Sequence, residues 1–280
     1  MNAFGESAEP GHGFPVDPTL ERRWGVAENG DVYEVALRPH LLDELRQRWP
    51  PVGLDRRATP VGPVVARIGL SDSWVGVPDA ELSGNCPPPV AWDLLERSLA
   101  VFTSLRLSRL VAVHSAVLVR HGRALLVPAT SGGGKSTLSR AAAAAGASVL
   151  SDEYALVDPE SGLVTGWNRP VRILTADGGV DRLDIAVASR PVPVGCVAFV
   201  SFQPEHGNAW AEISLGKAVG LLLSHTVCAT TRSHDSLDAA LAALSGARRV
   251  EGARGEAATA LGELFSLATG GTMDTQQREV

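Results

Sequence analysis

Cysteine is scarce in this sequence of 280 residues, and the three thiols, Cys86, Cys196 and Cys228, lie far apart. They form no C-x-x-C pair and no spacing typical of a metal site. An odd number of widely spaced cysteines is typical of reduced thiols, which persist in the cytoplasm. The sequence therefore predicts a cytoplasmic protein whose cysteines are reduced.

A surplus of positive charge is missing as well. The formal net charge is −6 and the isoelectric point is about 5.7, so the chain lacks the basic footprint of a nucleic-acid-binding protein. Long apolar runs are also missing, because the range 215–223 is too short to span a membrane and contains Lys217. The first residues lack the basic and apolar regions of a signal peptide. These absences predict a protein that binds neither nucleic acid nor membrane.

Apolar sequence is plentiful, and its distribution predicts how the chain is organised. Hydrophobic residues make up 45% of the chain, enough for one large core or two modest domains. Proline and glycine in the first twenty residues predict a loose arm, and Asn-Cys-Pro-Pro-Pro at 85–89 predicts a stiff linker. The predicted organisation is a flexible arm at 1–20, a small α+β region at 21–89, a catalytic domain at 90–270 and a disordered tail at 271–280.

Hydrophobic periodicity predicts the secondary structure of both parts. In the smaller part we expect strands at 31–37, 64–68 and 73–77 and a helix at 39–49. In the larger part we expect strands at 111–119, 123–127, 147–150, 155–157, 163–165 and 194–202, and helices at 92–107, 138–145, 214–223, 236–244 and 257–268. A further strand at 209–213 is expected to pair with 194–202. We also expect His121-Gly122 to form a tight hairpin turn between 111–119 and 123–127, and Ser214 to cap the helix that runs to Leu223.

The most specific motif is the stretch 129–137, Ala-Thr-Ser-Gly-Gly-Gly-Lys-Ser-Thr. It follows a predicted strand and precedes a predicted helix, which is the context of a phosphate-binding loop. Glycine lets backbone amides converge on phosphate oxygens, and the helix N-terminus adds partial positive charge. Lys135 would reach the β- and γ-phosphates, and the Ser136 hydroxyl would bind magnesium. The strict pattern has glycine where this chain has Ala129, which is tolerable only if Ala129 has a negative φ angle.

Two acidic residues follow the next predicted strand. Asp152 lies 152 − 135 = 17 residues after Lys135, at the end of the strand 147–150. If that strand lies beside the strand preceding the loop in a parallel sheet, its carboxyl end points into the phosphate crevice. Asp152 can then hold magnesium or act as a base, whereas Glu153 would point the other way in an extended chain. Alternatively, the two carboxylates only begin a polar turn.

His114 lies in the apolar run 110–118, on the same predicted face as Ala112 and Ala116. A histidine in such a strand is often a hydrogen-bonded core residue. Its position on the strand pair that feeds the phosphate loop makes it a candidate site residue.

Three segments together resemble the catalytic domain of the HPr kinase/phosphorylase family. They are Val-His-Ser-Ala-Val-Leu at 113–118, Ser-Gly-Gly-Gly-Lys-Ser-Thr at 131–137 and Ser-Asp-Glu at 151–153. The sequence is most similar to HPr-kinase-related proteins, some of which phosphorylate precursor peptides in lasso-peptide gene clusters. The resemblance covers about residues 107–225 and rests on the order of histidine, loop and acid pair. It implies an α/β fold, with a P-loop-containing kinase domain of mixed sheet and flanking helices after a small α+β region.

The resemblance also implies roles for particular residues. Asp152 is the base that takes the proton of the acceptor hydroxyl, and Lys135 and His114 complete the catalytic group. Ser136 and Glu153 bind magnesium. ATP is held by Ser131, Gly132, Gly133, Gly134, Lys135, Ser136 and Thr137.

Some positions depart from the family pattern. The second acid is Glu153 in place of aspartate, one methylene longer. The glycine-rich phosphorylase signature has no counterpart, so we expect kinase chemistry without the reverse phosphorolysis. Arg169, in Asn-Arg-Pro-Val at 168–171, resembles an Arg-Pro segment of related kinases and can contact phosphate or an acceptor carboxylate. A surface turn is an equal explanation for Arg169.

These observations lead to three functional hypotheses. The leading one is ATP- and magnesium-dependent phosphorylation of a serine hydroxyl on a peptide or small protein, such as the precursor peptide of a natural product. In the second, the acceptor is a small hydroxylated metabolite, which Arg169 would favour. In the third, the chain is a non-catalytic nucleotide-binding regulator or scaffold, and residues 21–85 recognise its partner. The resemblance is compatible with a homo-oligomer and fixes no number of subunits.

Overall fold

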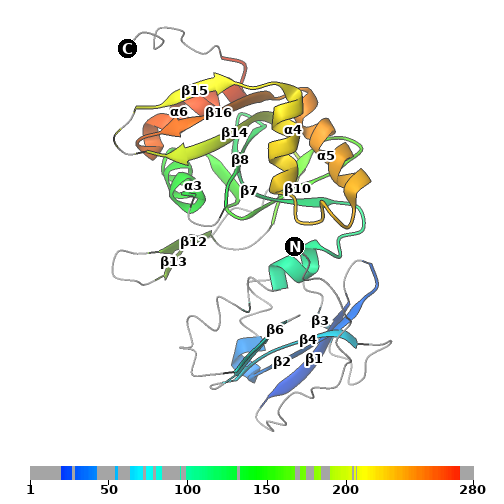
Figure 1. Ribbon diagram of the computed structural model, residues 1–280. Helices are drawn as coiled ribbons and strands as arrows, with labels where there is room; N and C mark the ends of the chain where they lie inside the picture. The colour runs from blue at the N-terminus through cyan, green and yellow to red at the C-terminus, as the bar shows by residue number, and fades with distance from the viewer. Residues whose placement is uncertain are drawn as a thin grey trace.

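The structure, a computed structural model, is an α/β protein with a mixed sheet of many strands and flanking helices (Figure 1). It describes residues 20–271 except 27–28, 43–53, 56–63, 72–73, 78–79, 84–94, 96–98, 131–132, 168–170, 175–179, 184–189, 204 and 206. The predicted linker at 85–89 and nearly all of the predicted arm and tail lie outside these residues. The prediction of a domain boundary there stays a prediction.

The larger sheet has eight strands among the described residues, in the order β11-β10-β7-β8-β14-β16-β15, with β9 also paired to β7. Its centre is parallel, because β14 pairs in parallel with both β8 and β16, and the remaining pairs are antiparallel. The carboxyl ends of these three central strands therefore lie at one edge of the sheet. The bounds are β7 Val111–Arg120, β8 Arg123–Pro128, β9 Ser148–Ser151, β10 Tyr154–Val157, β11 Val164–Gly166, β14 Val194–Phe202, β15 Ala209–Glu212 and β16 Arg248–Arg254.

The hairpin of β7 and β8 confirms the turn predicted at 121–122. His121 and Gly122 both have positive φ angles, 50° and 72°. Two consecutive residues of positive φ form the tight turn whose twist matches that of the flanking strands. The turn fixes the register, in which Arg120 lies opposite Arg123 and Ser115 lies opposite Pro128.

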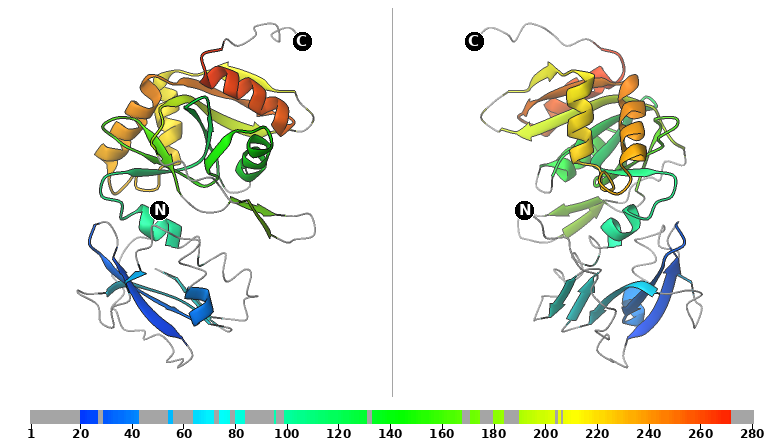
Figure 2. Two further views of the ribbon diagram at one scale, coloured as in Figure 1. Left: turned by 180° about the vertical axis from the view of Figure 1, so that it is seen from behind. Right: turned by 45° about the vertical axis from the view of Figure 1, so that its right-hand side comes forward.

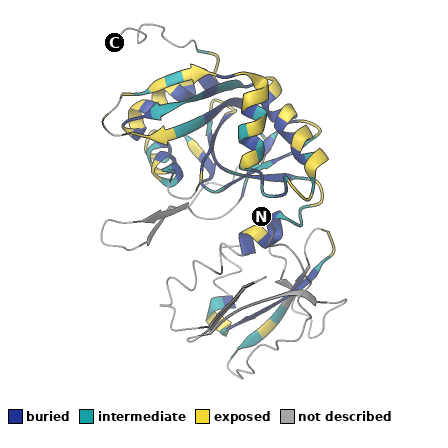
Figure 3. Cartoon of the chain, viewed as in Figure 1, coloured by how far each residue is buried: buried dark blue, intermediate teal, exposed yellow. Residues whose placement is uncertain are grey.

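Helices cover both faces of the larger sheet (Figures 1 and 2). Helices α3, Lys135–Ala144, and α6, Ala257–Ala268, pack on one face around Leu118, Leu125 and Leu138. Helices α4, Leu215–Ser224, and α5, Ser233–Ser245, pack on the other face around Val117, Leu126 and Leu222. The predicted cap of α4 is confirmed, because the Ser214 hydroxyl oxygen accepts a hydrogen bond from the Lys217 amide at 3.3 Å. Burial follows the same plan, since the central strands of the sheet are largely buried and the outer helix faces are exposed, whereas the edge strand β15 is mostly exposed (Figure 3).

The smaller sheet lies in the amino-terminal part and has the order β3-β1-β2-β4-β5-β6 among the described residues. Strand β2 is buried along its whole length and pairs in parallel with β4, whereas the other pairs are antiparallel. Its bounds are β1 Glu21–Val26, β2 Val32–Leu37, β3 Leu54–Asp55, β4 Val64–Ser71, β5 Trp74–Val77 and β6 Ala80–Ser83. A separate two-stranded sheet pairs β12 Val171–Leu174 with β13 Val180–Leu183.

One hydrophobic cluster joins the two large sheets. It contains Tyr33 and Leu37 of β2, Phe102 of the helical stretch 99–104, and Tyr154 and Trp167 of the larger part. The Phe102 and Tyr33 rings meet edge to face at 5.3 Å, and an ion pair links Arg106 to Asp31 at 2.9 Å. Both parts of the chain therefore contribute to the same buried core.

Two strand neighbours predicted from the sequence were wrong. The strand ending at Ser151, β9, lies beside β7 and is antiparallel to it, so β7 separates it from β8. Because β8 is also antiparallel to β7, β8 and β9 still run in the same direction and end at the same edge. Strand β15 pairs with β16 and not with β14, because the unpredicted strand β16 occupies the place between them.

Among the described residues, no helix is long and apolar enough to cross a membrane.

Candidate phosphate-binding and catalytic site

The described residues of the loop after β8 have backbone features that suit the predicted phosphate-binding loop. Helix α3 begins at Lys135, and its N-cap residue, Gly134, has a left-handed φ of 82° that disfavours any side chain. Ala129 has no positive φ, as the sequence analysis required. A side chain at Gly133 would approach the Ala129 Cβ atom to 2.8 Å. The departure at Ala129 is therefore accommodated by the glycine at 133.

Lys135 is 8% exposed and folds back over the loop. Its ammonium donates hydrogen bonds to the Ala129 and Thr130 carbonyl oxygens, at 2.6 and 3.0 Å. Burial lowers the pKa of Lys135, and the nearby carboxylates of Glu153 and Asp152 oppose that shift. Both predicted acids therefore lie within electrostatic reach of the loop lysine.

Ser136 and Asp152 are in direct contact across the site. The Ser136 hydroxyl donates a hydrogen bond to the Asp152 carboxylate at 3.1 Å, and Asp152 is 4% exposed. The chain bends at 152–153 because the Ser151 hydroxyl accepts the backbone amides of Glu153 and Tyr154, at 3.1 and 3.0 Å. Since the chain is not extended there, the alternation of an extended strand does not apply to the two acids, and both act on the charge of Lys135.

His114 lies beside the beginning of the loop and the acid pair. Its carbonyl accepts the Ala129 amide at 3.4 Å, and the next residue, Ser115, donates its amide to the Glu153 carbonyl at 2.9 Å. The His114 ring lies 5.7 Å from the Tyr154 ring. The backbone of β7 thus connects the predicted histidine to both the loop and the acids.

His225 also belongs to this region and was missed from the sequence. It follows α4, and its carbonyl accepts the His114 amide at 2.8 Å. Strand β8 pairs with β7 only from Ser115 onward, and Val113, just before that point, forms an isolated bridge with Thr226 instead. Burial lowers the pKa of His225, and the positive charge of Lys135 lowers it further. No local motif marks His225, because only the fold brings it to the loop.

Arg254, the last residue of β16, was missed as well. Its side chain is buried and lies against Gly134.

Three of the remaining candidates, Ser131, Gly132 and Arg169, lie outside the described residues, and their roles stay predictions. Thr137 is exposed in the first turn of α3.

The donor set suits magnesium bound together with a phosphate. Among the described residues, no three histidine, cysteine or acidic side chains form a metal-binding group. Magnesium usually keeps several waters and takes one or two protein oxygens plus phosphate oxygens. The Ser136 hydroxyl and the carboxylates of Asp152 and Glu153 provide oxygens of that kind, near the N-terminus of α3.

Similarity to known proteins adds no assignment. No protein-family model matches this sequence, and no curated protein matches it.

Proposed function

We propose that this chain is a P-loop kinase that transfers the γ-phosphoryl group of ATP to a serine hydroxyl of a peptide or small protein. The observation that carries the proposal is the contact between Ser136 and Asp152 next to the buried Lys135. A phosphate-binding loop, a hydroxyl for magnesium and a carboxylate for the acceptor are the parts that phosphoryl transfer needs. In this chain the loop and the hydroxyl belong to one segment, and the carboxylate follows the next strand, 16 residues after Ser136.

Each residue would have a defined task in that reaction. The amides of the loop and of α3 would bind the phosphate groups. The Lys135 ammonium would give up its hydrogen bonds to two loop carbonyls and donate to phosphate oxygens instead. Ser136 and Glu153 would hold magnesium, which when bound neutralises phosphate charge. Asp152 would orient the acceptor hydroxyl and take its proton. His114, on the strand beside the acid pair, would orient Asp152 or the phosphate.

Removing the proton acceptor is the sharpest test of this assignment. Asp152→Asn keeps an oxygen beside the Ser136 hydroxyl, so the affinity for ATP with magnesium should stay nearly unchanged. Transfer should fall by about 10²- to 10⁴-fold, the usual contribution of a general base. Calorimetry would give the affinity, and labelled ATP with a cell extract, separated by product size, would give both the transfer rate and the acceptor class.

Two control variants make the result specific. Asp158→Asn removes a carboxylate that lies in the turn between β10 and β11 and pairs with Arg109, and it should leave transfer intact. Lys135→Ala should weaken both ATP binding and transfer. Full turnover in Asp152→Asn would refute its role as the base, and unchanged ATP affinity in Lys135→Ala would refute the phosphate-binding loop itself.

A further inference from the structure

Arg254 ends strand β16 on the edge of the sheet that carries the phosphate-binding loop. Strands β8, β14 and β16 are parallel, so the loop after β8 and the last residues of β14 and β16 lie at the same edge. Arg254 is only 2% exposed. A guanidinium is rarely buried to this extent unless it is paired, because removing a charge from water is costly.

The surroundings of Arg254 do not neutralise its charge. Its Nη1 atom donates to the Gly255 carbonyl at 3.0 Å, and its guanidinium carbon lies 4.7 Å from the centre of the Phe202 ring. Within the described part of the chain, Nε has no hydrogen-bond partner and no carboxylate forms an ion pair with Arg254. Glu256 acts on it only at longer range, and burial still lowers the pKa of Arg254.

The guanidinium instead faces the amino-terminal end of α3. A methyl group at Gly134 would overlap the Nη2 atom of Arg254, so this nitrogen lies directly against the N-cap of the helix. The next residue is Lys135. A buried guanidinium therefore lies against the positive end of a helix dipole, an arrangement that favours binding of an anion.

We infer that Arg254 is a further phosphate-contacting residue, which binds the β- and γ-phosphate oxygens of the nucleotide together with Lys135. The inference rests on the proposed function. Arginine presents a planar fork of donors that matches two phosphate oxygens, and such charge-assisted hydrogen bonds are strong. The exposed ring of Phe202, which lies opposite Arg254 on β14, contacts the guanidinium, so we assign Phe202 as a positioning residue.

In the transfer step Arg254 keeps its proton and stabilises charge. The acceptor oxygen forms a bond to the γ-phosphorus while the bond from that phosphorus to the β–γ bridging oxygen breaks, leaving ADP. The hydroxyl proton passes to Asp152. Negative charge grows on the bridging oxygen during this exchange, and a fixed guanidinium at that place lowers the barrier.

Two substitutions test the role of Arg254 against a purely structural one. In Arg254→Met the affinity for ATP and for ADP should fall by about tenfold or more, the usual effect of losing a hydrogen bond between charged groups, whereas AMP affinity should not change. The melting temperature without nucleotide should stay the same or rise, because a buried charge with no ion pair is removed. Arg254→Lys should keep part of the affinity and lose transfer rate.

The control is Arg248→Met at the opposite end of the same strand. Arg248 pairs with Glu212 on the surface, so its loss should leave all three nucleotide affinities unchanged. Calorimetry with ATP, ADP and AMP on the full chain gives the comparison. Phe202→Leu, which keeps Arg254 and removes its ring contact, should lower ATP affinity without affecting AMP affinity.

The outcomes separate this inference from the proposed function. If Lys135→Ala loses ATP binding while Arg254→Met keeps it, Arg254 has no part in phosphate binding. A lower melting temperature of Arg254→Met with unchanged affinity of the folded protein would mean that the residue is structural. If the natural protein binds ATP no better than Lys135→Ala does, the proposed function fails, and the role of Arg254 fails with it.

Discussion

At the scale of single residues, the loop depends on which position lacks a side chain. The usual first glycine of the motif is Ala129 here, and its methyl occupies space that a side chain at Gly133 would need. Gly133 has no positive φ, so its requirement for glycine is one of space alone, whereas Gly134 also needs its left-handed conformation. The sequence alone predicted the φ of Ala129 but could not show which neighbour compensates for it.

This relation predicts a rescue experiment. Gly133→Ala should weaken ATP binding by pushing the loop away from the Ala129 methyl, and adding Ala129→Gly should restore much of the affinity because the 2.8 Å approach disappears. Calorimetric titration of the two single variants and the double variant measures the coupling. Purely additive losses would show that the two positions do not compete for space. Gly146→Ala, at a glycine of positive φ with open space around it, is the control for a general loss of stability.

His225 leads to a prediction about pH. Its folded pKa lies below the ordinary value of 6.5, chiefly because of burial and also because of Lys135. The unfolded chain therefore binds this proton first as the pH falls, so stability decreases from about pH 6.5 down to the folded pKa. The His225→Gln variant lacks this group, so its melting temperature should fall less between pH 7.5 and pH 5.5 than that of the natural protein. His234→Gln, at an exposed position on α5, should behave like the natural protein, and identical slopes in all three would contradict the assignment.

At the scale of elements, hydrophobic pattern predicted most of the apolar strands of the larger sheet and missed its charged strand, β16, as well as several short strands elsewhere. Strand β16 reads Arg-Arg-Val-Glu-Gly-Ala-Arg, and Val250 and Arg254 are its buried residues. It is a strand because β14 and β15 both pair with its backbone, which no local signal reveals. Arg254 could not be proposed as a site residue for the same reason. The acids and the loop could be predicted because each follows an apolar strand.

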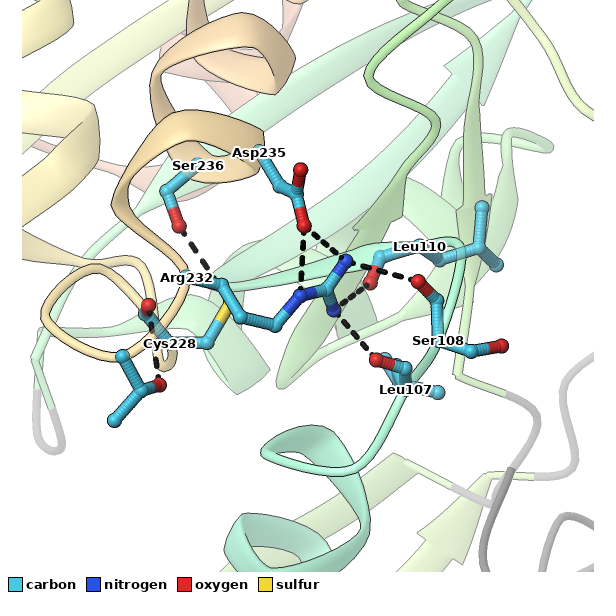
Figure 4. A network of polar contacts seen from close by, with 8 residues as sticks. Leu107, Ser108, Leu110, Cys228, Arg232, Asp235 and Ser236 are labelled. Atoms are coloured by element: carbon cyan, nitrogen blue, oxygen red, sulfur yellow. Dashed lines mark hydrogen bonds and ion pairs between the residues drawn. The ribbon is translucent and has the colours of Figure 1, made fainter. Parts of the chain in front are cut away.

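Helix α5 is tied to the beginning of β7 by a single side chain (Figure 4). The guanidinium of Arg232 donates hydrogen bonds to the carbonyls of Leu107, Ser108 and Leu110, at 2.5 to 3.1 Å, and to the carboxylate of Asp235 at 2.9 Å. The side chain is 19% exposed. These bonds hold the segment from which the strand of His114 begins.

Loss of this connection should destabilise the fold measurably. Arg232→Ala is expected to cost about 2–3 kcal/mol, because several carbonyls lose a charged donor at once. Arg109→Ala removes an arginine that is also ion-paired but whose side chain is 74% exposed, and it should cost less than about 1 kcal/mol. Urea unfolding of the two variants gives the difference, and equal losses would mean that the carbonyl bonds contribute little.

At the scale of the whole molecule, the amino-terminal sheet and the larger sheet share a core. Phe102 packs on Tyr33, and the same cluster reaches Tyr154, which follows the acid pair. The proline-rich sequence at 85–89 predicted two consecutive units, because hydrophobic periodicity says nothing about packing between distant segments. The shared cluster connects the amino-terminal part to the strand that begins directly after Glu153.

Truncating Phe102 should therefore affect both parts together. Phe102→Ala is expected to cost about 3–5 kcal/mol, the usual range for a buried aromatic ring. Hydrogen exchange should then accelerate in β2 and in β10 alike. Val101→Ala changes the neighbouring position, which is 44% exposed, and should be close to neutral. Faster exchange confined to β2 would show that the two sheets are energetically independent.

The short turn at His121-Gly122 has a consequence for how this protein can change during evolution. It sets the register of β7 against β8, and side chains along a strand alternate between the two faces of the sheet. One inserted residue that shifted this pairing would turn the His114 side chain to the opposite face, although the turn lies at the far end of the hairpin from the loop. Lineages of this fold should therefore vary freely in length at many surface loops while keeping this turn at two residues.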